Sequence, residues 1–511
     1  MRDATVISAQ AGLTRLRRRL GRYTLAVVAL ALVHVFAVPL CPAGACDRAT
    51  AELISTLCLG AFIVITVLHV LGAVRADAAS LLTPPVVFPM GAALYFGFGS
   101  LSTIHADPAT LSFMSFGNYG LTPWELLITS RLTFVGMAVA LGVMLLVMSL
   151  RIGRETPRET VQMGLGRTAA FFLIGGALLK YGLVLPQEYG FISFTVPGTL
   201  KTLTGLTDLG FAVAAYLAVR GNRRWWLIFW VFWPINLGLS TLEFSKRVIV
   251  FAILLPAAGA FLGHRNWKRV IPWVLFAGLA YASLQDVNTA GRLTILDRTG
   301  SISDAGLAER FRILSDVVSG QIDISQTAST ARAAAQVWWL RLNYSGPQIR
   351  AIDLYDQGSP GDPSLSFLSV LVPRFLWPDK PLADSQGREF NRLVSGRFDA
   401  TTRVGMSVYA DGYWQKGWPG LVLFAAIMGA AMGLVTLITY PALAARQMIY
   451  LPIIFLGARM AALGPMGYLQ KSFIGALPIF LGYLLLIWIF QQIARGPRAR
   501  RWSGPAGVPA A

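Results

Sequence analysis

The sequence predicts an all-α, polytopic membrane protein with about 12 transmembrane helices and one large, partly helical extramembrane loop. Hydrophobic residues make up 55% of the 511-residue chain and charged residues only 14%, with a mean hydropathy of +0.58. A soluble domain carries roughly a quarter charged residues. Apolar stretches of about 20 residues, the length that crosses a bilayer as a helix, recur along the whole chain.

Nine of the predicted spans precede the loop and three follow it. Several are short or contain proline, which bundled spans tolerate when their neighbours satisfy the freed backbone groups. The predicted spans are Tyr23–Leu40, Leu53–Ala73, Leu81–Gly99, Leu132–Leu150, Ala169–Leu185, Leu203–Val219, Trp225–Leu242, Val248–Gly263, Val270–Leu284, Leu421–Tyr440, Met448–Leu463 and Phe473–Phe490.

The positive charge predicts the topology. The net charge of +19 gathers at both termini and in alternate short loops, where basic residues mark the cytoplasmic side. We therefore expect a multi-pass protein of the bacterial inner (cytoplasmic) membrane, with both termini cytoplasmic. The predicted segments are a basic N-terminus (1–22), helices 1–9 (23–285), a periplasmic loop (286–418), helices 10–12 (419–491) and a basic tail (492–511).

The same distribution argues against nucleic-acid binding, because the long loop holds about as many acidic as basic residues. The basic N-terminal run could also begin a signal peptide, but the apolar stretch after it is long enough to span and shows no obvious cleavage site. Cys41 and Cys46 flank a short periplasmic loop and are read equally well as a disulfide or as two unpaired residues. No cysteine–histidine cluster has zinc spacing, so neither a metal nor a cofactor is expected.

The long loop contains a proline-rich run, Val372-Pro373-Arg374-Phe375-Leu376-Trp377-Pro378-Asp379-Lys380-Pro381. Proline fixes φ and pushes the preceding residue towards extended geometry. The run therefore predicts a stiff platform that holds Arg374 and Lys380 in set directions at an anion-binding site. The alternative is a rigid loop whose charges face water. Elsewhere in the loop, Ala305–Val318 and Ser329–Leu342 have helix-like composition.

A second unusual stretch is Glu243-Phe244-Ser245-Lys246-Arg247, the turn between the seventh and eighth spans. Two cations at a predicted periplasmic turn work against the charge bias of insertion. They would suit a lipid diphosphate headgroup, because arginine and lysine both bind phosphate oxygens. The alternative is a pair that snorkels to ordinary phospholipid phosphates.

These two stretches, together with Asp411-Gly412-Tyr413-Trp414-Gln415-Lys416-Gly417-Trp418-Pro419-Gly420, resemble the Wzy-type oligosaccharide repeat-unit polymerases, in the group that includes O-antigen ligases. The family pattern begins the third passage with Glu, where this chain has Asp411. The span count and the late periplasmic loop agree with the family.

The resemblance implies a membrane glycosyltransferase that polymerises oligosaccharide repeat units carried on an undecaprenyl diphosphate-type lipid, without a metal, into a surface polysaccharide or exopolysaccharide. Its partners would be lipid-linked oligosaccharides, membrane lipids, a chain-length regulator and a repeat-unit flippase. Preorganised cations would stabilise the leaving diphosphate, and a carboxylate would act as base or form a structural salt bridge. The candidates are Arg374, Asp379, Asp411 and Glu243 for catalysis, and Lys246, Arg247, Lys380, Trp377 and Tyr409 for diphosphate or substrate binding.

Three other functions fit parts of the sequence. A ligase would transfer the glycan to another acceptor with the same periplasmic cations. A transporter or flippase of lipid-linked sugar would place ionisable residues inside the spans, where Lys180 and Asp208 are available to pair. A scaffold for other envelope enzymes would leave both unusual stretches without a role.

Overall fold

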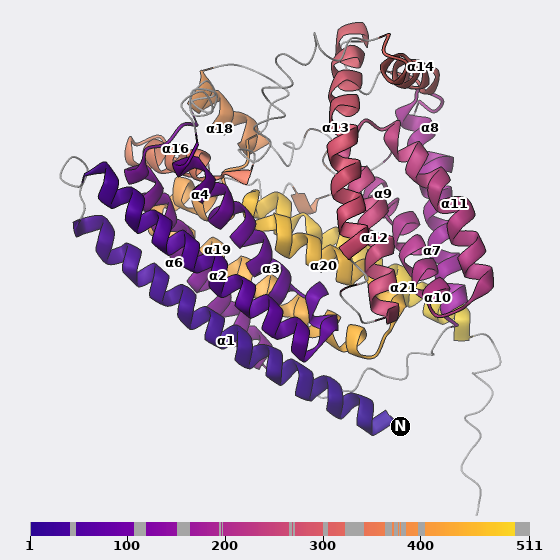
Figure 1. Ribbon diagram of the computed structural model, residues 1–511, viewed down its shortest axis with the longest axis horizontal. Helices are drawn as coiled ribbons and strands as arrows, with labels where there is room; N and C mark the ends of the chain where they lie inside the picture. The colour runs from indigo at the N-terminus through magenta and orange to yellow at the C-terminus, as the bar shows by residue number, and fades with distance from the viewer. Residues whose placement is uncertain are drawn as a thin grey trace, which may run out of the picture. The chain divides into compact units, whose positions relative to one another are not determined.

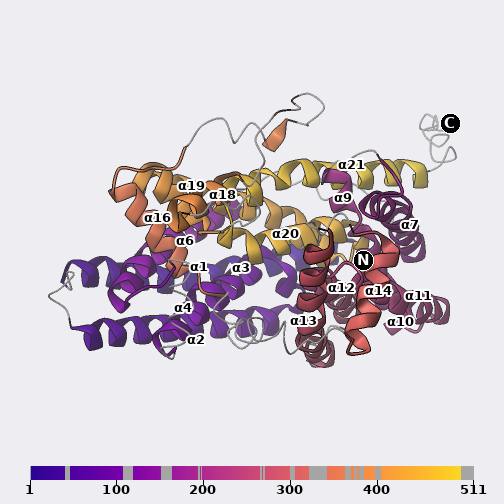
Figure 2. The same ribbon diagram turned by 90° about the horizontal axis from the view of Figure 1, so that it is seen from above.

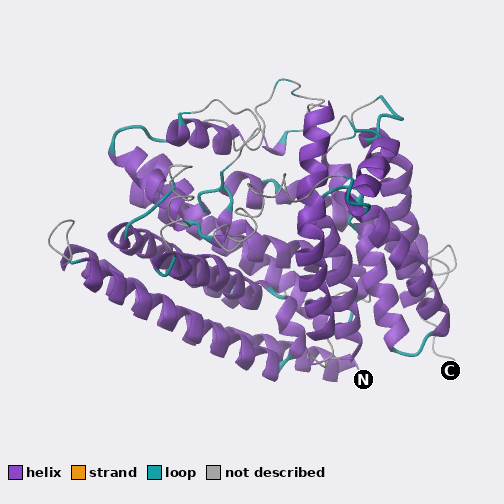
Figure 3. Cartoon of the chain, turned by 45° about the horizontal axis from the view of Figure 1, so that its top comes forward, coloured by secondary structure: helices purple, strands orange, loops and turns teal. Residues whose placement is uncertain are grey.

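The computed structural model describes residues 2–40, 47–106, 119–150, 164–193, 196, 198–264, 268, 271–299, 305–321, 342–362, 370–372, 377, 379, 385–396 and 404–495. Every regular element in these ranges is helical (Figure 3). The chain separates into two compact units. Unit 1 contains residues 1–152, 325–446 and 454–478, and unit 2 contains residues 153–324, 447–453 and 479–511.

The protein is a multi-pass membrane protein. Within the described ranges, nine helices are long and apolar enough to cross a membrane. Two of the other predicted spans correspond to shorter apolar helices, Val248–His264 and Ile271–Ala280. The remaining one, α11 (Arg223–Thr241), does not reach the same criterion, although it is helical. The total of 12 spans therefore stays a prediction.

Unit 1 is built around α1 (Arg2–Leu40), α2 (Arg48–Ala76), α6 (Pro123–Ser149) and α19 (Val408–Ala444). The first three lie side by side in Figure 1, and α6 packs against both α1 and α19. Gly429 of α19 lies directly on the backbone of Ala140 in α6, so that a Cβ at this position would overlap the Ala140 carbonyl. Small residues let helices approach closely in a membrane.

The third predicted span is broken once, at Thr83, whose backbone is extended. It consists of η1 (Ala78–Leu82), α3 (Pro84–Ala92), the π-helical turn η2 (Ala93–Phe98) and α4 (Gly99–Ile104). A similar interruption separates the last two spans, where η6 (Met448–Tyr450) leads into α20 (Leu451–Leu463), and η7 (Gly464–Met466) and η8 (Gln470–Ile474) precede α21 (Ala476–Arg495). Local π turns are rare and often occur at functional sites.

The helix α19 consists of two helices joined by a sharp bend. Lys416 (φ −146°) and Gly417 (φ 62°) leave helical geometry, and only glycine adopts the second conformation without strain. The short first part packs back on the second, because Gly412 and Gly420 touch through their backbones. Residues 408–415, which belong to the predicted periplasmic loop, thus form a buried helix that returns into the bundle.

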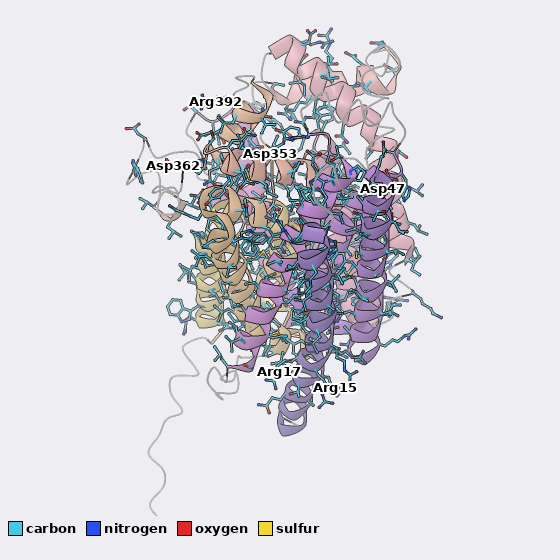
Figure 4. All side chains as sticks on the ribbon, turned by 90° about the vertical axis from the view of Figure 1, so that its left-hand side faces the viewer. Arg15, Arg17, Asp47, Asp353, Asp362 and Arg392 are labelled. Atoms are coloured by element: carbon cyan, nitrogen blue, oxygen red, sulfur yellow. The ribbon has the colours of Figure 1, made fainter. Side chains whose placement is uncertain are left out.

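Two shorter helices, α16 (Ser345–Asp356) and α18 (Ser385–Ser395), cover one end of unit 1 beside the start of α19 (Figure 2). Phe390 of α18 packs edge-on against Trp414 of α19, with 5.6 Å between the ring centroids. Figure 4 shows Arg15 and Arg17 at the opposite end of unit 1 from Asp47, Asp353 and Arg392. Which of these two ends faces the cytoplasm stays a prediction.

Unit 2 surrounds α10 (Leu206–Val219), whose residues are buried from Leu206 to Leu217. The helix packs against α7 (Leu165–Leu179), α11 and α12 (Lys246–His264), which lie around it in Figure 1. The π-helical η3 (Lys180–Val184) and α8 (Leu185–Glu188) continue α7, and α9 (Gly198–Leu203) leads into α10.

The helix α13 (Ile271–Thr299) continues well past the predicted end of the ninth span, into the segment predicted as loop. It packs against α14 (Leu307–Val318), which confirms the helix predicted at Ala305–Val318. The other predicted loop helix, Ser329–Leu342, lies almost wholly outside the described residues, as do Cys41 and Cys46.

Candidate functional site

The residues predicted to form the site divide between the two units. Glu243, Lys246 and Arg247 belong to unit 2, and the other six belong to unit 1. Arg374 and Lys380 lie outside the described residues. Lys246 and Arg247 begin α12, but the structure does not describe their side chains. The predicted meeting of these four cations therefore stays a prediction.

Two of the predicted site residues in the proline-rich run are described by the structure, and both are accessible. Asp379 is exposed and Trp377 is half-buried. Tyr409, by contrast, is completely enclosed in unit 1: its ring lies 5.7 Å from that of Phe96 and against the backbone of Gly136. In this conformation the Tyr409 ring packs the bundle and is not available to stack on a sugar.

Asp411 is also buried, with 1% of its surface exposed. Its Oδ2 accepts a hydrogen bond from the backbone N–H of Leu469 at 3.1 Å, and its Oδ1 accepts one from Gln415 Nε2 at 2.8 Å. The carboxylate thereby ties the returning helix of α19 to the segment that starts η8. The structural role expected for this carboxylate was a salt bridge, but no described cation forms one with Asp411. Its structural contacts are the two hydrogen bonds instead.

Glu243 takes part in a buried polar network in unit 2. Lys180 Nζ lies 3.4 Å from Glu243 Oε1 and donates to Asn236 Oδ1 at 3.5 Å and to Ser240 Oγ at 3.4 Å. Asn236 Nδ2 in turn donates to Asp208 Oδ1 at 3.0 Å. Lys180 and Asp208, only 6% and 9% exposed, are thus connected through the Asn236 amide, without a direct ion pair. We call these five residues the Lys180 network.

The Lys180 network contains one cation, the Lys180 ammonium, and two carboxylates, Glu243 and Asp208. Burial raises the pKa of Glu243, and the nearby Lys180 ammonium opposes that rise. Arg310 of α14 binds the turn that carries Glu243, since its Nη1 donates to the carbonyl of Leu242 at 3.1 Å. The turn that carries Glu243 is therefore fixed from two sides.

Replacing Lys180 with methionine is expected to destabilise the protein by about 3 kcal/mol, because the buried Asp208 and the partly buried Glu243 would lose their only cation in the network. Thermal unfolding of the purified protein in detergent would measure the change. Lys201→Met is the matched control: Lys201 pairs with Glu188 at 3.1 Å, both side chains are about one-third exposed, and we expect a loss of less than about 1 kcal/mol. Equal losses in the two variants would contradict this interpretation.

Unit 1 contains a cavity of about 660 Å³ at the end covered by α16 and α18. Its volume lies within the range of small-molecule binding pockets. Polar and apolar residues line it in similar measure: Gly120, Leu121, Thr122, Glu125, Arg350, Asp353, Leu354, Gln357, Leu393 and Val394. We call this cavity the Arg350 pocket.

Arg350 holds the wall of the pocket together. Its Nη1 donates to Asp353 Oδ2 at 2.7 Å, and its Nη2 donates to the Gly120 carbonyl at 2.9 Å. Glu125 Oε1 lies 3.5 Å from the same Nη2. Burial raises the pKa of Asp353, an effect that the Arg350 hydrogen bond opposes. With two carboxylates around one guanidinium, the wall offers acceptor oxygens to hydroxyl groups.

The Arg350 pocket was not predicted from the sequence. Thr122-Pro123-Trp124-Glu125 carries a capping box, in which Thr122 and Glu125 each bind the other's backbone N–H. That signature would have placed the start of α6 at Pro123 instead of Leu132. No local signal brings Arg350 to Glu125, since they meet only through the packing of α16 on α6.

Comparisons of the chain with models of known protein families, with curated proteins and with solved structures found no match.

Proposed function

We propose that the protein polymerises lipid-linked oligosaccharide repeat units at the periplasmic face of the inner membrane. The observation that supports this best is the Arg350 pocket, a cavity of mixed polar and apolar lining at the end of unit 1 opposite the basic start of α1. In the proposed reaction, a hydroxyl oxygen of one repeat unit bonds to the anomeric carbon of the growing glycan. The bond from that carbon to the lipid diphosphate breaks, and the hydroxyl proton passes to a base.

The Arg350 pocket has the chemistry to hold sugar. Hydroxyl groups of a sugar can donate to the oxygens of Asp353 and Glu125, and Thr122 and Gln357 can both donate and accept. Leu354 and Leu393 add apolar surface for the C–H faces of the ring. We assign the pocket to the repeat unit that supplies the attacking hydroxyl.

The leaving diphosphate would be stabilised by Arg374 and Lys380, with Lys246 and Arg247 as further cations. Among the three predicted bases, Glu243 is paired with Lys180 and Asp411 is held by two hydrogen bonds. Asp379 is exposed and adjoins the proposed cations in sequence, so it is our preferred base.

A gel of surface glycan from wild-type cells and from a deletion strain tests the proposed function. We expect a ladder of chain lengths in the wild type and single lipid-linked repeat units in the deletion. Long chains that remain on the carrier in the deletion would identify a ligase. Unchanged chain assembly and attachment would contradict both reactions.

Asp353→Asn is expected to shorten the ladder, because the amide offers fewer acceptor sites to sugar hydroxyls. Glu389→Gln, on the exposed face of α18 beside Arg392, is the matched control and should leave the ladder unchanged. The raised pKa of Asp353 means that protonation begins at a higher pH than for a free aspartate. Wild-type chain length should therefore fall as the medium is acidified, and the Asp353→Asn variant should lose that dependence. Normal chain length in this variant would exclude Asp353 from the site.

A second candidate function is transport of a lipid-linked sugar across the membrane. The Lys180 network supports it, because ionisable residues buried among apolar helices often lie on transport pathways. Purified protein in vesicles that contain a fluorescent lipid-linked sugar would test this reading. Transfer between leaflets above that of protein-free vesicles, lost in Asp208→Asn, would favour a flippase.

A further inference from the structure

Arg131 is a charged residue on a membrane-spanning helix, and the described part of the chain gives it no salt bridge. It lies on α6, and its guanidinium carbon stands 5.2 Å from the centre of the Trp418 ring. Its Nε is buried without a hydrogen-bond partner, and no described carboxylate lies within ion-pair distance. Asp356 is close enough to attract it electrostatically but accepts a hydrogen bond from the Tyr413 hydroxyl at 3.3 Å.

Aromatic rings fix the position of this arginine. Trp418 packs edge-on against Tyr413 with 5.6 Å between centroids, and Tyr413 against Tyr355 with 5.2 Å. These rings stand at the bend of α19, where Lys416 is exposed. Tryptophan and tyrosine are enriched where a membrane protein meets the headgroups. The exposed Lys416 at the bend thus lies two residues from Trp418, the ring on which the Arg131 guanidinium of α6 stands.

The length of α6 agrees with this depth. Its 27 residues extend about 40 Å, about 10 Å more than the hydrocarbon core. Arg131 lies about 12 Å from the end at Pro123, which the sequence predicts to be periplasmic. If the overhang is shared equally between the two ends, the Arg131 Cα lies about 7 Å inside the hydrocarbon core. Its side chain leans towards the helix N-terminus and can extend from there towards the lipid phosphates. Its planar fork can bind two phosphate oxygens at once.

We propose that Arg131, held on Trp418, binds the phosphate of an anionic lipid in the outer leaflet, with Lys416 as a second cation. The phosphate chemistry is shared by two sources, an ordinary anionic phospholipid and the diphosphate of the lipid-linked substrate. Assigning the site to the lipid-linked substrate rests on the proposed function. The phosphate site itself does not depend on that function.

Native mass spectrometry of the full-length protein in detergent would test the site, with titration of phosphatidylglycerol and, separately, undecaprenyl diphosphate. Arg131→Gln should weaken lipid binding about tenfold or more, because a charge-assisted contact is lost. Arg48→Gln is the matched control. Arg48 lies at the same predicted face, is exposed and pairs with Glu52 at 2.7 Å, so its loss should leave lipid binding unchanged.

The two lipids distinguish the sources. Tighter binding of undecaprenyl diphosphate than of phosphatidylglycerol, lost in Arg131→Gln, assigns the site to the substrate, and equal binding assigns it to bilayer phospholipid. Wild-type binding in Arg131→Gln, or an equal loss in Arg48→Gln, overturns the proposal. If Arg131→Gln does not fold, Trp418→Leu provides the same test, since it releases the arginine but keeps its charge.

This experiment is independent of glycan synthesis. A protein that makes a normal ladder but binds lipid equally well without the Arg131 charge would overturn only the lipid site. A deletion strain with unchanged glycan would overturn only the proposed function.

Discussion

Cells that carry Arg374→Ala are expected to accumulate single lipid-linked repeat units in place of a glycan ladder. In the proposed reaction the diphosphate gains charge as its bond to the sugar breaks, and a preorganised guanidinium stabilises that charge more in the transition state than in the ground state. Loss of one such group costs about a hundredfold or more in rate, enough to remove visible polymer. The glycan gel should be read at matched protein level.

Two further variants make this result specific. Arg374→Lys should recover little activity if the planar fork binds two oxygens, because an ammonium is a point charge. Arg392→Ala is the matched control, since Arg392 is exposed on α18 and lies 3.9 Å from Glu389, too far for a strong ion pair. It should leave the ladder intact. A normal ladder in Arg374→Ala would remove the proline-rich run from the proposed site.

Gly259→Leu is expected to prevent unit 2 from folding. A Cβ on Gly259 would overlap the backbone carbonyl of Ala212, so α12 and α10 would have to separate. Backbone atoms cannot move aside as a flexible side chain can, and overpacking of a close-packed interior already costs about 1–3 kcal/mol in milder cases. We expect little monodisperse protein by fluorescence-detected size-exclusion chromatography.

Gly238→Leu on α11 provides the control for that experiment. No described atom lies within 4 Å of a Cβ built at Gly238, and the residue is exposed. Leucine has the higher helix propensity, so this variant should be at least as stable as the wild type. Comparable yields and unfolding temperatures for the two leucine variants would show that α10 and α12 do not pack as closely as described.

Helix positions followed from sequence wherever apolar composition alone decides them. Each of the predicted spans corresponds to a described helix, because a bilayer-crossing segment must satisfy its own backbone and be apolar over about 20 residues. Helix ends were less predictable. The prediction began α6 at Leu132, because Arg131 and Glu125 lower the local hydropathy, whereas the capping box starts the helix at Pro123.

For the site residues too, composition predicted some features and packing decided the others. The proline-rich run and the Glu243 turn stand out by composition, and the sequence connects them only through the predicted topology. Tyr409 was a candidate for substrate binding, but the returning helix of α19 buries its ring. That return depends on the Gly417 conformation and on the contact between Gly412 and Gly420, neither of which hydropathy reports.

The sequence by itself determined that this is a multi-pass helical membrane protein, because the transfer of apolar side chains and of backbone groups into lipid depends on each segment alone. Only the tertiary structure decided that Lys180 reaches Asp208 through Asn236, that Arg350 lies between Glu125 and Asp353, and that Arg131 stands on the Trp418 ring. In each of these contacts, the packing of helices or the winding of one helix brings the residues together. Their partners are chosen by the packing of small residues and by the need to satisfy buried polar groups, and both are properties of the assembled bundle.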